Sequence, residues 1–232
     1  MNIKIMTGSA LKLIAVTTMA CDHTAAYLLR YVDAFTEPLF LYHNWEVSWY
    51  FLMRSVGRIA FPIFAFLIVE GFIHTRNRRR YGWSLFIWAL ISEIPWALIH
   101  HGFRFTSHNV MFTLFWGFLA LCAIERWRDD RRKIGLILVA MLVVAFLFHA
   151  DYNGSGFAFI VLLYTMRRHL VMQVLAGCCM LPMKWMPGLA FIPISMYNGR
   201  RGFIHGSFAK YLFYAFYPVH LFVLWLLQRL VI

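Results

Sequence analysis

Asp22 and His23 are neighbours in the middle of an apolar stretch that runs from Leu11 to Val32. The stretch is long enough to cross a bilayer, which takes ~20 apolar residues. A charged Asp at membrane depth costs at least ~2.5 kcal/mol, so such groups mostly line a cavity, a relay or a reaction site. We therefore expect this pair to mark the functional site, with a structural polar clasp between helices as the alternative.

Further polar residues interrupt the apolar stretches. Arg54 and Arg58 are four residues apart, so they share one face of a helix, and either can pair with Asp22 or lie near the interface. Asn109 opens another apolar run, where it can donate hydrogen bonds to a ligand or cap the helix. His220 follows Tyr217 by three residues in the last run, so both can share a face. We expect most of these groups to converge on one polar cavity.

The composition is that of an integral membrane protein. The chain has 232 residues, of which 62% are hydrophobic, and its mean hydropathy is +0.66. Soluble domains contain only ~45–50% apolar residues. The net charge of +12 is clustered beside apolar runs, which favours membrane topology over nucleic-acid binding. The four cysteines lie in apolar stretches without metal-ligand spacing, so we expect neither a metal site nor a disulfide.

The hydrophobic pattern predicts an all-α bundle of about nine transmembrane helices, with eight or ten as alternatives. We expect a single domain over residues 1–232. The apolar runs lie at about residues 10–32, 48–73, 82–100, 109–126, 133–149, 153–166, 170–183, 186–197 and 208–230.

Lysine and arginine predict the orientation. Four basic segments alternate with loops that are nearly free of Lys and Arg, so with about nine spans all four fall on one side of the membrane. This places the N-terminus in the cytoplasm and the C-terminus outside. The basic segments are 75–80, 126–133, 167–169 and 200–210, and the intervening loops are 33–49, 101–108, 149–153 and 183–187.

The order of the polar groups resembles the TraX family, whose members are membrane proteins that acetylate conjugative pilin. The resemblance covers the chain from about residue 10 to its end. It rests on Asp22-His23, on the block from Gly57 to Phe66 that continues to Asn77, and on the segments 91–95, 109–113, 197–199 and 213–221. The family is similar in type to multispan acyltransferases, which pass acyl groups from cytosolic acyl-CoA to acceptors across a membrane.

The resemblance implies that acetyl-CoA is the donor and that the N-terminal amine of pilin, or a surface glycan, is the acceptor. Acetyl transfer needs a base for the acceptor proton, a route for the thioester and donors for the oxyanion. We expect His23 to be the base or a covalent acetyl carrier. The other expected catalytic residues are Asp22, Arg58, Asn109 and His220. The residues expected to bind the donor are Arg54, Arg76, Arg78, Arg79, Arg80, Tyr197, Asn198, Arg200, Arg201 and Tyr217.

Two other functions remain open from the sequence. A proton-coupled secondary transporter would use the same intramembrane Asp, His and Arg as a relay. A non-catalytic pilus-assembly protein would leave the polar residues dispersed. In each case we expect a multi-pass protein of the bacterial inner membrane. A tunnel from the basic side to His23 would distinguish these functions.

Overall fold

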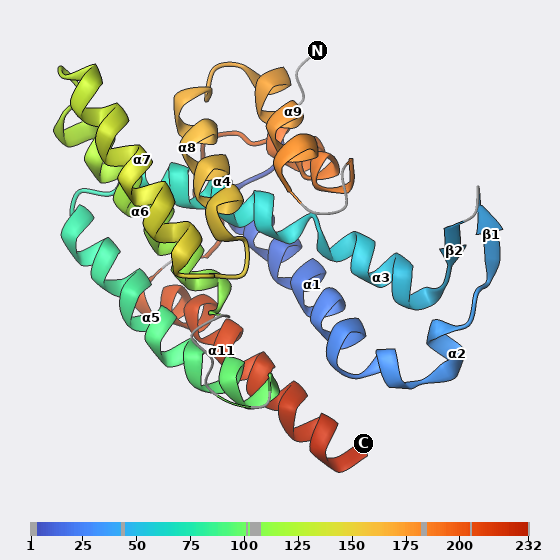
Figure 1. The fold of residues 1–232 in the computed structure, drawn as a ribbon. Helices are drawn as coiled ribbons and strands as arrows, with labels where there is room; N and C mark the ends of the chain where they lie inside the picture. The colour runs from blue at the N-terminus through green and yellow to red at the C-terminus, as the bar shows by residue number, and fades with distance from the viewer. Residues whose placement is uncertain are drawn as a thin grey trace.

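The computed structural model describes residues 4–42, 45–100, 102, 108–181, 185–204 and 206–231 (Figure 1). The elements are, in chain order, α1 (Gly8–Tyr27), the 3-10 helix η1 (Leu29–Tyr31), α2 (Asp33–Thr36), β1 (Phe40–Tyr42), β2 (Trp45–Val47), α3 (Trp49–Gly57), α4 (Ala60–His74), α5 (Arg78–Ile99), α6 (Val110–Arg126), α7 (Arg131–Leu147), α8 (Asn153–Thr165), α9 (Leu170–Met180), the 3-10 helix η2 (Met186–Ala190), α10 (Phe191–Ser195) and α11 (Gly206–Val231).

The predicted all-α bundle is confirmed, and each apolar run corresponds to a helix or to two consecutive helices. The run at 48–73 is α3 and α4, which are separated by a turn at Arg58 and Ile59. The run at 186–197 is η2 and α10. The antiparallel hairpin of β1 and β2, in which Phe40 pairs with Val47, was not predicted. The expected loops at 101–108 and 183–187 lie partly outside the described residues.

The helices differ in their ability to cross a membrane. Among the described residues, three are long and apolar enough, namely Trp49–His74 (α3 with α4), Arg78–Ile99 (α5) and Phe208–Leu230 within α11. By contrast, α9 has 11 residues and spans only about 16 Å, against a hydrocarbon core of about 30 Å. The runs at 170–183 and 186–197 are therefore each too short to cross the hydrocarbon core alone, in keeping with the alternative helix counts. They form short helices that contact each other.

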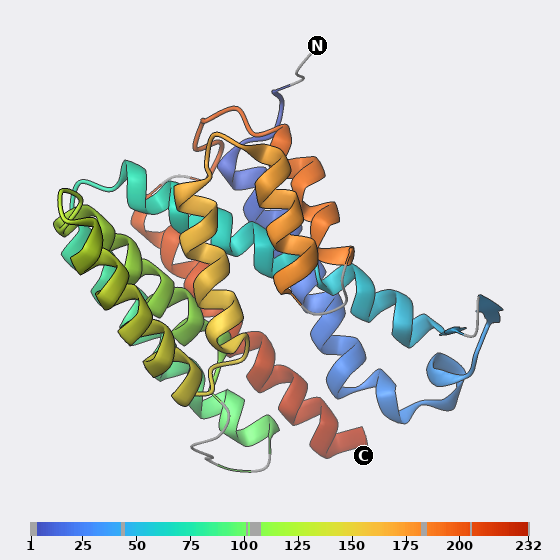
Figure 2. The same cartoon turned by 45° about the horizontal axis from the view of Figure 1, so that its top comes forward.

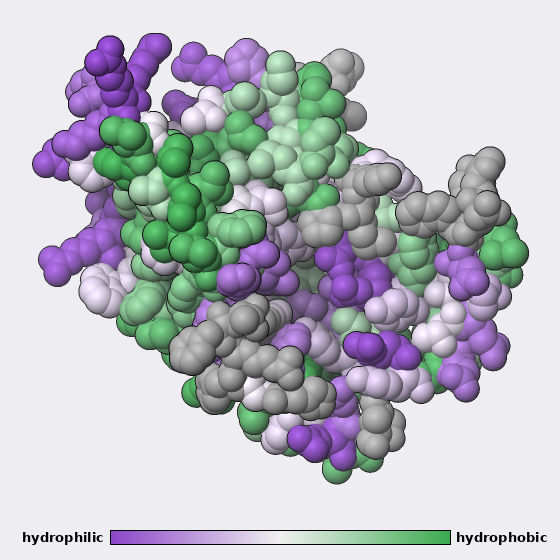
Figure 3. All heavy atoms as spheres, in the orientation of Figure 1, coloured by the Kyte–Doolittle hydropathy of each residue, from purple (hydrophilic) through white to green (hydrophobic). Residues whose placement is uncertain are grey.

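The basic segments gather at one end of the bundle, which we call the basic end. There α4 meets α5, α6 meets α7, α8 meets α9, and α1 begins (Figures 1 and 2). Hydrophilic residues lie over the junction of α6 with α7, and hydrophobic residues cover the faces of α7 and α9 (Figure 3). We call the opposite end, where α1 ends and the β1–β2 hairpin lies, the hairpin end. The common side of the basic loops agrees with the sequence prediction.

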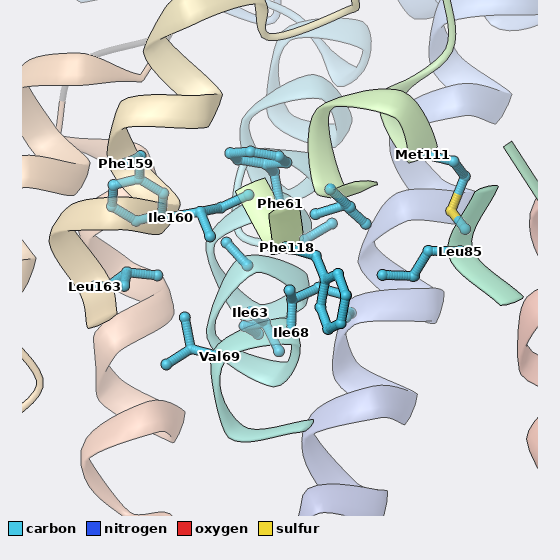
Figure 4. Packing of buried hydrophobic residues seen from close by; sticks show 14 of the residues in the cluster. Phe61, Ile63, Ile68, Val69, Leu85, Met111, Phe118, Phe159, Ile160 and Leu163 are labelled. Carbon is cyan, nitrogen blue, oxygen red and sulfur yellow. The ribbon is translucent and has the colours of Figure 1, made fainter. Parts of the chain in front are cut away.

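The hydrophobic core is centred on α4. Its side chains Phe61, Ile63 and Val69 are 3%, 0% and 2% exposed, and they face residues of α5, α6 and α8 (Figure 4). Small residues bring the helices close, because a Cβ at Gly117 of α6 would lie 2.4 Å from Ile160 of α8. This packing holds the polar faces of α1, α4, α5 and α11 around a common space.

Candidate functional site

A cavity of about 980 Å³ lies among α1, α3, α4, α5 and α11. At the basic end its wall includes Lys12 and Arg201. At the hairpin end it includes Tyr27 and Arg54, and His23 lies between the two. The cavity therefore connects the basic end of the bundle to the polar residues inside it.

His23 of α1 and His220 of α11 meet in this region. His23 Nδ1 lies 2.6 Å from His220 Nε2, and the two rings stack with centroids 4.9 Å apart. His220 Nδ1 lies 2.9 Å from the carbonyl oxygen of Phe216. A carbonyl oxygen only accepts hydrogen bonds, so His220 Nδ1 carries a proton and its Nε2 accepts when the ring is neutral. The proton between the two rings then belongs to His23 Nδ1.

This chain of hydrogen bonds fixes the tautomer of His23. With the proton on Nδ1, the Nε2 of neutral His23 carries a lone pair. Within the described part of the chain no group hydrogen-bonds to that nitrogen, and His23 lines the cavity. Tyr27 and Tyr217 pack edgewise against the ring, with centroid distances of 5.7 and 6.2 Å. The structure thus presents an oriented, unprotonated nitrogen to the cavity, as the base of a proton transfer requires.

Asp22 points away from His23 and binds the two arginines. Its Oδ2 lies 2.6 Å from Arg54 Nη1, and its Oδ1 lies 3.5 Å from Arg58 Nη2. Adjacent helical residues diverge by about 100°, which explains why Asp22 and His23 serve different partners. The absence of a side chain at Gly57 permits this arrangement, because a Cβ there would lie 2.1 Å from the Asp22 Cβ. Asp22 and the two arginines together place one net positive charge beside His23.

Tyr217 offers a hydroxyl group to the same space. The residue is 4% exposed and lines the cavity. Its hydroxyl oxygen is buried, and among the residues that the structure describes no acceptor takes its proton. Buried hydroxyl groups normally have partners, so this group is suited to donate to a bound ligand next to His23.

Asn109 does not contribute to the cavity. Its Nδ2 donates to the carbonyl oxygen of Ala89 at 2.9 Å and to Glu93 Oε2 at 2.5 Å. Its Oδ1 accepts from the backbone N–H of Met111 and caps α6. This corrects the expected oxyanion role, because every polar atom of the side chain already has a protein partner. The helix cap, which was the alternative, is its role.

The basic end of the cavity differs from the predicted set. Among the described residues, the cations that line the basic end of the cavity are Lys12, Arg80, Arg201 and Lys210. Four predicted arginines lie elsewhere on the basic end, namely Arg76, Arg78, Arg79 and Arg200. Of these, Arg78 lies 4.0 Å from Glu125 and covers the ring of Phe72. Lys12 and Lys210 were missed because positive charge near a helix end is first explained by topology.

The loop after α10 is bound to the start of α1. The backbone N–H groups of Gly8 and Ser9 donate to the carbonyl oxygens of Arg200 and Arg201, each at 2.9 Å. This satisfies helix donors that would otherwise lack partners and holds Arg201 beside the cavity. Gly202 in this loop has a φ of +87°, and a Cβ added there would lie 2.4 Å from Thr7 Oγ1.

Two predicted donor-binding residues lie in this loop. Tyr197 lines the cavity, where burial and the carboxylate of Glu70 raise its pKa to about 12. Asn198 instead accepts the backbone N–H of Arg200 at 2.9 Å. Asn198 therefore shapes the turn and is not among the described residues that line the cavity. Its neighbours Tyr197 and Gly199 line the cavity instead.

The turn between α7 and α8 adds two polar residues to the cavity, as the expected convergence of polar groups on one cavity would require. Asp151 and Tyr152 line the cavity. Asp151 is accessible to solvent at this position of the wall. The available signal was the rarity of acidic residues, since the chain contains 10 Asp and Glu in total. Among the described residues no cluster of three His, Cys, Asp or Glu side chains could hold a metal ion.

Comparison with known proteins gives two matches. The family model described as "TraX protein" matches residues 7–228. A protein of Dichelobacter nodosus, described as "Probable fimbrial assembly protein FimC, serogroup H1", is 27% identical over 240 residues, and the match covers 91% of each chain. No solved structure matches. The family match spans the cavity from α1 to α11.

Proposed function

The chain belongs to the TraX protein family, and on this premise we propose that it is a multi-pass membrane acetyltransferase. It transfers an acetyl group from acetyl-CoA to an amine or hydroxyl acceptor. The observation that carries the proposal is the cavity that joins a cationic end to an unprotonated nitrogen of His23. A non-catalytic scaffold does not need such an oriented base.

The cationic end suits the phosphate groups of CoA. Lys12, Arg80, Arg201 and Lys210 come from four parts of the chain and share the cavity wall. Arginine and lysine bind phosphate through charge-assisted hydrogen bonds. Lys12 and His23 are both on α1. They lie about 11 positions apart, which is about 16 Å along the helix axis. The extended pantetheine arm of acetyl-CoA bridges such a gap and brings the thioester to His23.

The reaction follows from this placement. His23 Nε2 takes a proton from the acceptor as its nitrogen or oxygen attacks the thioester carbon. Tyr217 donates a hydrogen bond to the carbonyl oxygen as negative charge develops on it. The carbon–sulfur bond then breaks, and the departing thiolate receives the proton from His23. Attack by His23 itself, followed by transfer from an acetyl-imidazole, would give the same products.

The charge distribution supports an orientation with the basic end in the cytosol. Acetyl-CoA then enters from the cytosol, and the acceptor reaches His23 from the hairpin end, across the bacterial inner membrane. The fimbrial-assembly description of the Dichelobacter nodosus relative supports a pilus subunit as the acceptor. A surface glycan is the alternative acceptor.

Calorimetric titration of the purified protein in detergent with acetyl-CoA tests the donor site. We expect binding in the micromolar range and a loss of roughly tenfold to a hundredfold in affinity for Lys12→Ala or Arg201→Ala, because each removes a charged hydrogen bond. The matched control is Lys133→Ala, since Lys133 lies at the basic end over Trp127 and does not line the cavity. An absence of binding, or equal losses in all three variants, would contradict the donor assignment.

A further inference from the structure

The turn that carries Asp151 is held in a fixed and strained conformation. The backbone N–H of Asp151 donates to the carbonyl oxygen of His108 at 2.9 Å, and the N–H of His108 donates to the carbonyl oxygen of His149 at 3.1 Å. His149 and Asn153 have φ values of 51° and 44°, which are uncommon for residues other than glycine. Such strain persists where the surroundings impose it, and it is frequent at ligand sites.

Packing between rings also fixes the turn against α4. Tyr152 stacks on Phe61 with ring centroids 3.8 Å apart, and Phe61 belongs to the buried core. The turn therefore cannot move freely, and it holds the carboxylate of Asp151 on the wall of the cavity.

The carboxylate of Asp151 differs from that of Asp22 because it has no partner. Asp22 is paired with two arginines, whereas no hydrogen bond or ion pair within the described chain reaches the side chain of Asp151. Burial raises the pKa of Asp151 to about 6, and the positive charge of Arg58 opposes the rise. At neutral pH the group is therefore mainly ionised and available to a cation.

Asp151 and His23 both line the cavity. The same wall includes Tyr27 and Tyr217, which are the two tyrosines that contact the edge of the His23 ring. The cations near Asp151 are Arg54, which is hydrogen-bonded to Asp22 at 2.6 Å, and Arg58, which lies 3.5 Å from Asp22 and does not hydrogen-bond to Asp151 within the described chain. A positively charged group in this part of the cavity would therefore find Asp151 as its open counter-ion.

Building on the proposed acetyl transfer, we propose that Asp151 binds the ammonium group of a primary-amine acceptor and holds it at His23 Nε2. Asp151 thereby gives amine acceptors a preference over hydroxyl acceptors. The ammonium group first loses a proton through Asp151 to water. The neutral nitrogen attacks the thioester carbon, gives its second proton to His23, and forms the amide bond as the carbon–sulfur bond breaks. The thiolate accepts the proton from His23, so one proton is released in each turnover.

The test compares two probes that differ only at the reacting group. One is a short peptide amide with a free α-amine, and the other is its α-hydroxy analogue. Calorimetry with the CoA-loaded protein in detergent should show that the wild type binds the amine roughly tenfold to a hundredfold more tightly, as expected for a charged hydrogen bond. Asp151→Asn should abolish this preference, and Asp151→Glu should retain part of it.

The matched control is Asp129→Asn, because the Asp129 side chain is 95% exposed and lies at the basic end. It should behave as the wild type does. Equal binding of the two probes by the wild type, or an unchanged preference in Asp151→Asn, would overturn the assignment of Asp151. The same samples given acetyl-CoA separate the two proposals. An amine preference without acetylation would refute the acetyltransferase, whereas acetylation without an amine preference would refute the subsite alone.

Discussion

The contact between His23 and His220 leads to a prediction about two histidines that act as one unit. If His23 is the base, His23→Ala should lower kcat by roughly 10²- to 10⁴-fold, which is the usual contribution of general-base catalysis. His220 touches the reaction only through its hydrogen bond of 2.6 Å to His23 Nδ1. Such a bond is worth about 0.5–1.5 kcal/mol, or roughly twofold to thirteenfold in rate. Loss of the fixed tautomer adds to this, so we expect His220→Ala to lower kcat by roughly tenfold to a hundredfold.

Two further variants sharpen this prediction. His220→Gln keeps one acceptor for His23 Nδ1 and one donor for the Phe216 carbonyl oxygen, so its kcat should stay within roughly tenfold of the wild type. The double variant His23→Ala, His220→Ala should be no slower than His23→Ala alone, because residues that act as a unit are not additive. The measurement is transfer of a radiolabelled acetyl group to the amine probe, with size-exclusion chromatography as the control for folding.

Additive losses in the double variant would refute the reasoning, since they would show that His220 contributes independently of His23. A well-folded His23→Ala protein with nearly wild-type turnover would also refute it, and it would move the base to another residue.

Three other predictions concern stability. Gly57→Ala should lower both the unfolding temperature and acetyl transfer, because the new methyl group would displace Asp22 at a cost of roughly 1–3 kcal/mol; Gly135→Ala, whose added Cβ meets nothing within 4 Å, should leave both unchanged or slightly raise stability. Gly202→Ala should lower the unfolding temperature, because a left-handed backbone costs a residue with a side chain about 1–2 kcal/mol and each kcal/mol corresponds to about 2–4 °C. An unchanged unfolding temperature would contradict this strain. Asp151 should increasingly destabilise the folded protein as pH rises from about 4, near its unfolded pKa, to its raised folded pKa of about 6, so Asp151→Asn should melt at a higher temperature than the wild type at neutral pH. The difference should disappear on lowering the pH to about 4, near the unfolded pKa, and a constant difference would exclude Asp151 as its source.

The helices could be predicted from the sequence because burial in lipid or in the core leaves long apolar runs. The position of His23 within the site could also be expected, because an ionisable group at membrane depth has few other uses. The partners were harder to predict. Which of Asp22 and His23 meets Arg54, and which meets His220, depends on the rotation of α1 against α3 and α11. That rotation is set by packing at positions such as Gly57, not by the spacing of polar residues.

The remaining errors also have physical causes. Asn109 has the residue type of an oxyanion donor, but its amide hydrogens are already donated to Ala89 and Glu93. Only the fold shows this. Lys12 and Asp151 lie in segments that sequence alone assigns to a helix end and a turn, and they join the cavity through tertiary packing. Most side chains of the basic runs at 75–80 and 200–201 are exposed on the surface. Positive charge on one side of a membrane protein sets its orientation in the membrane, so a basic run need not bind a ligand.

The most direct test of acetyl transfer across the membrane uses sealed vesicles of uniform orientation. Vesicles are prepared with the basic end inside and loaded with isotopically labelled acetyl-CoA, and the amine probe is added outside. Intact-mass analysis should show the probe gaining one labelled acetyl group with the wild type and none with His23→Ala. Vesicles that receive acetyl-CoA only on the outside should leave the probe unmodified. Equal labelling by the wild type and His23→Ala, or labelling from either side, would contradict the account.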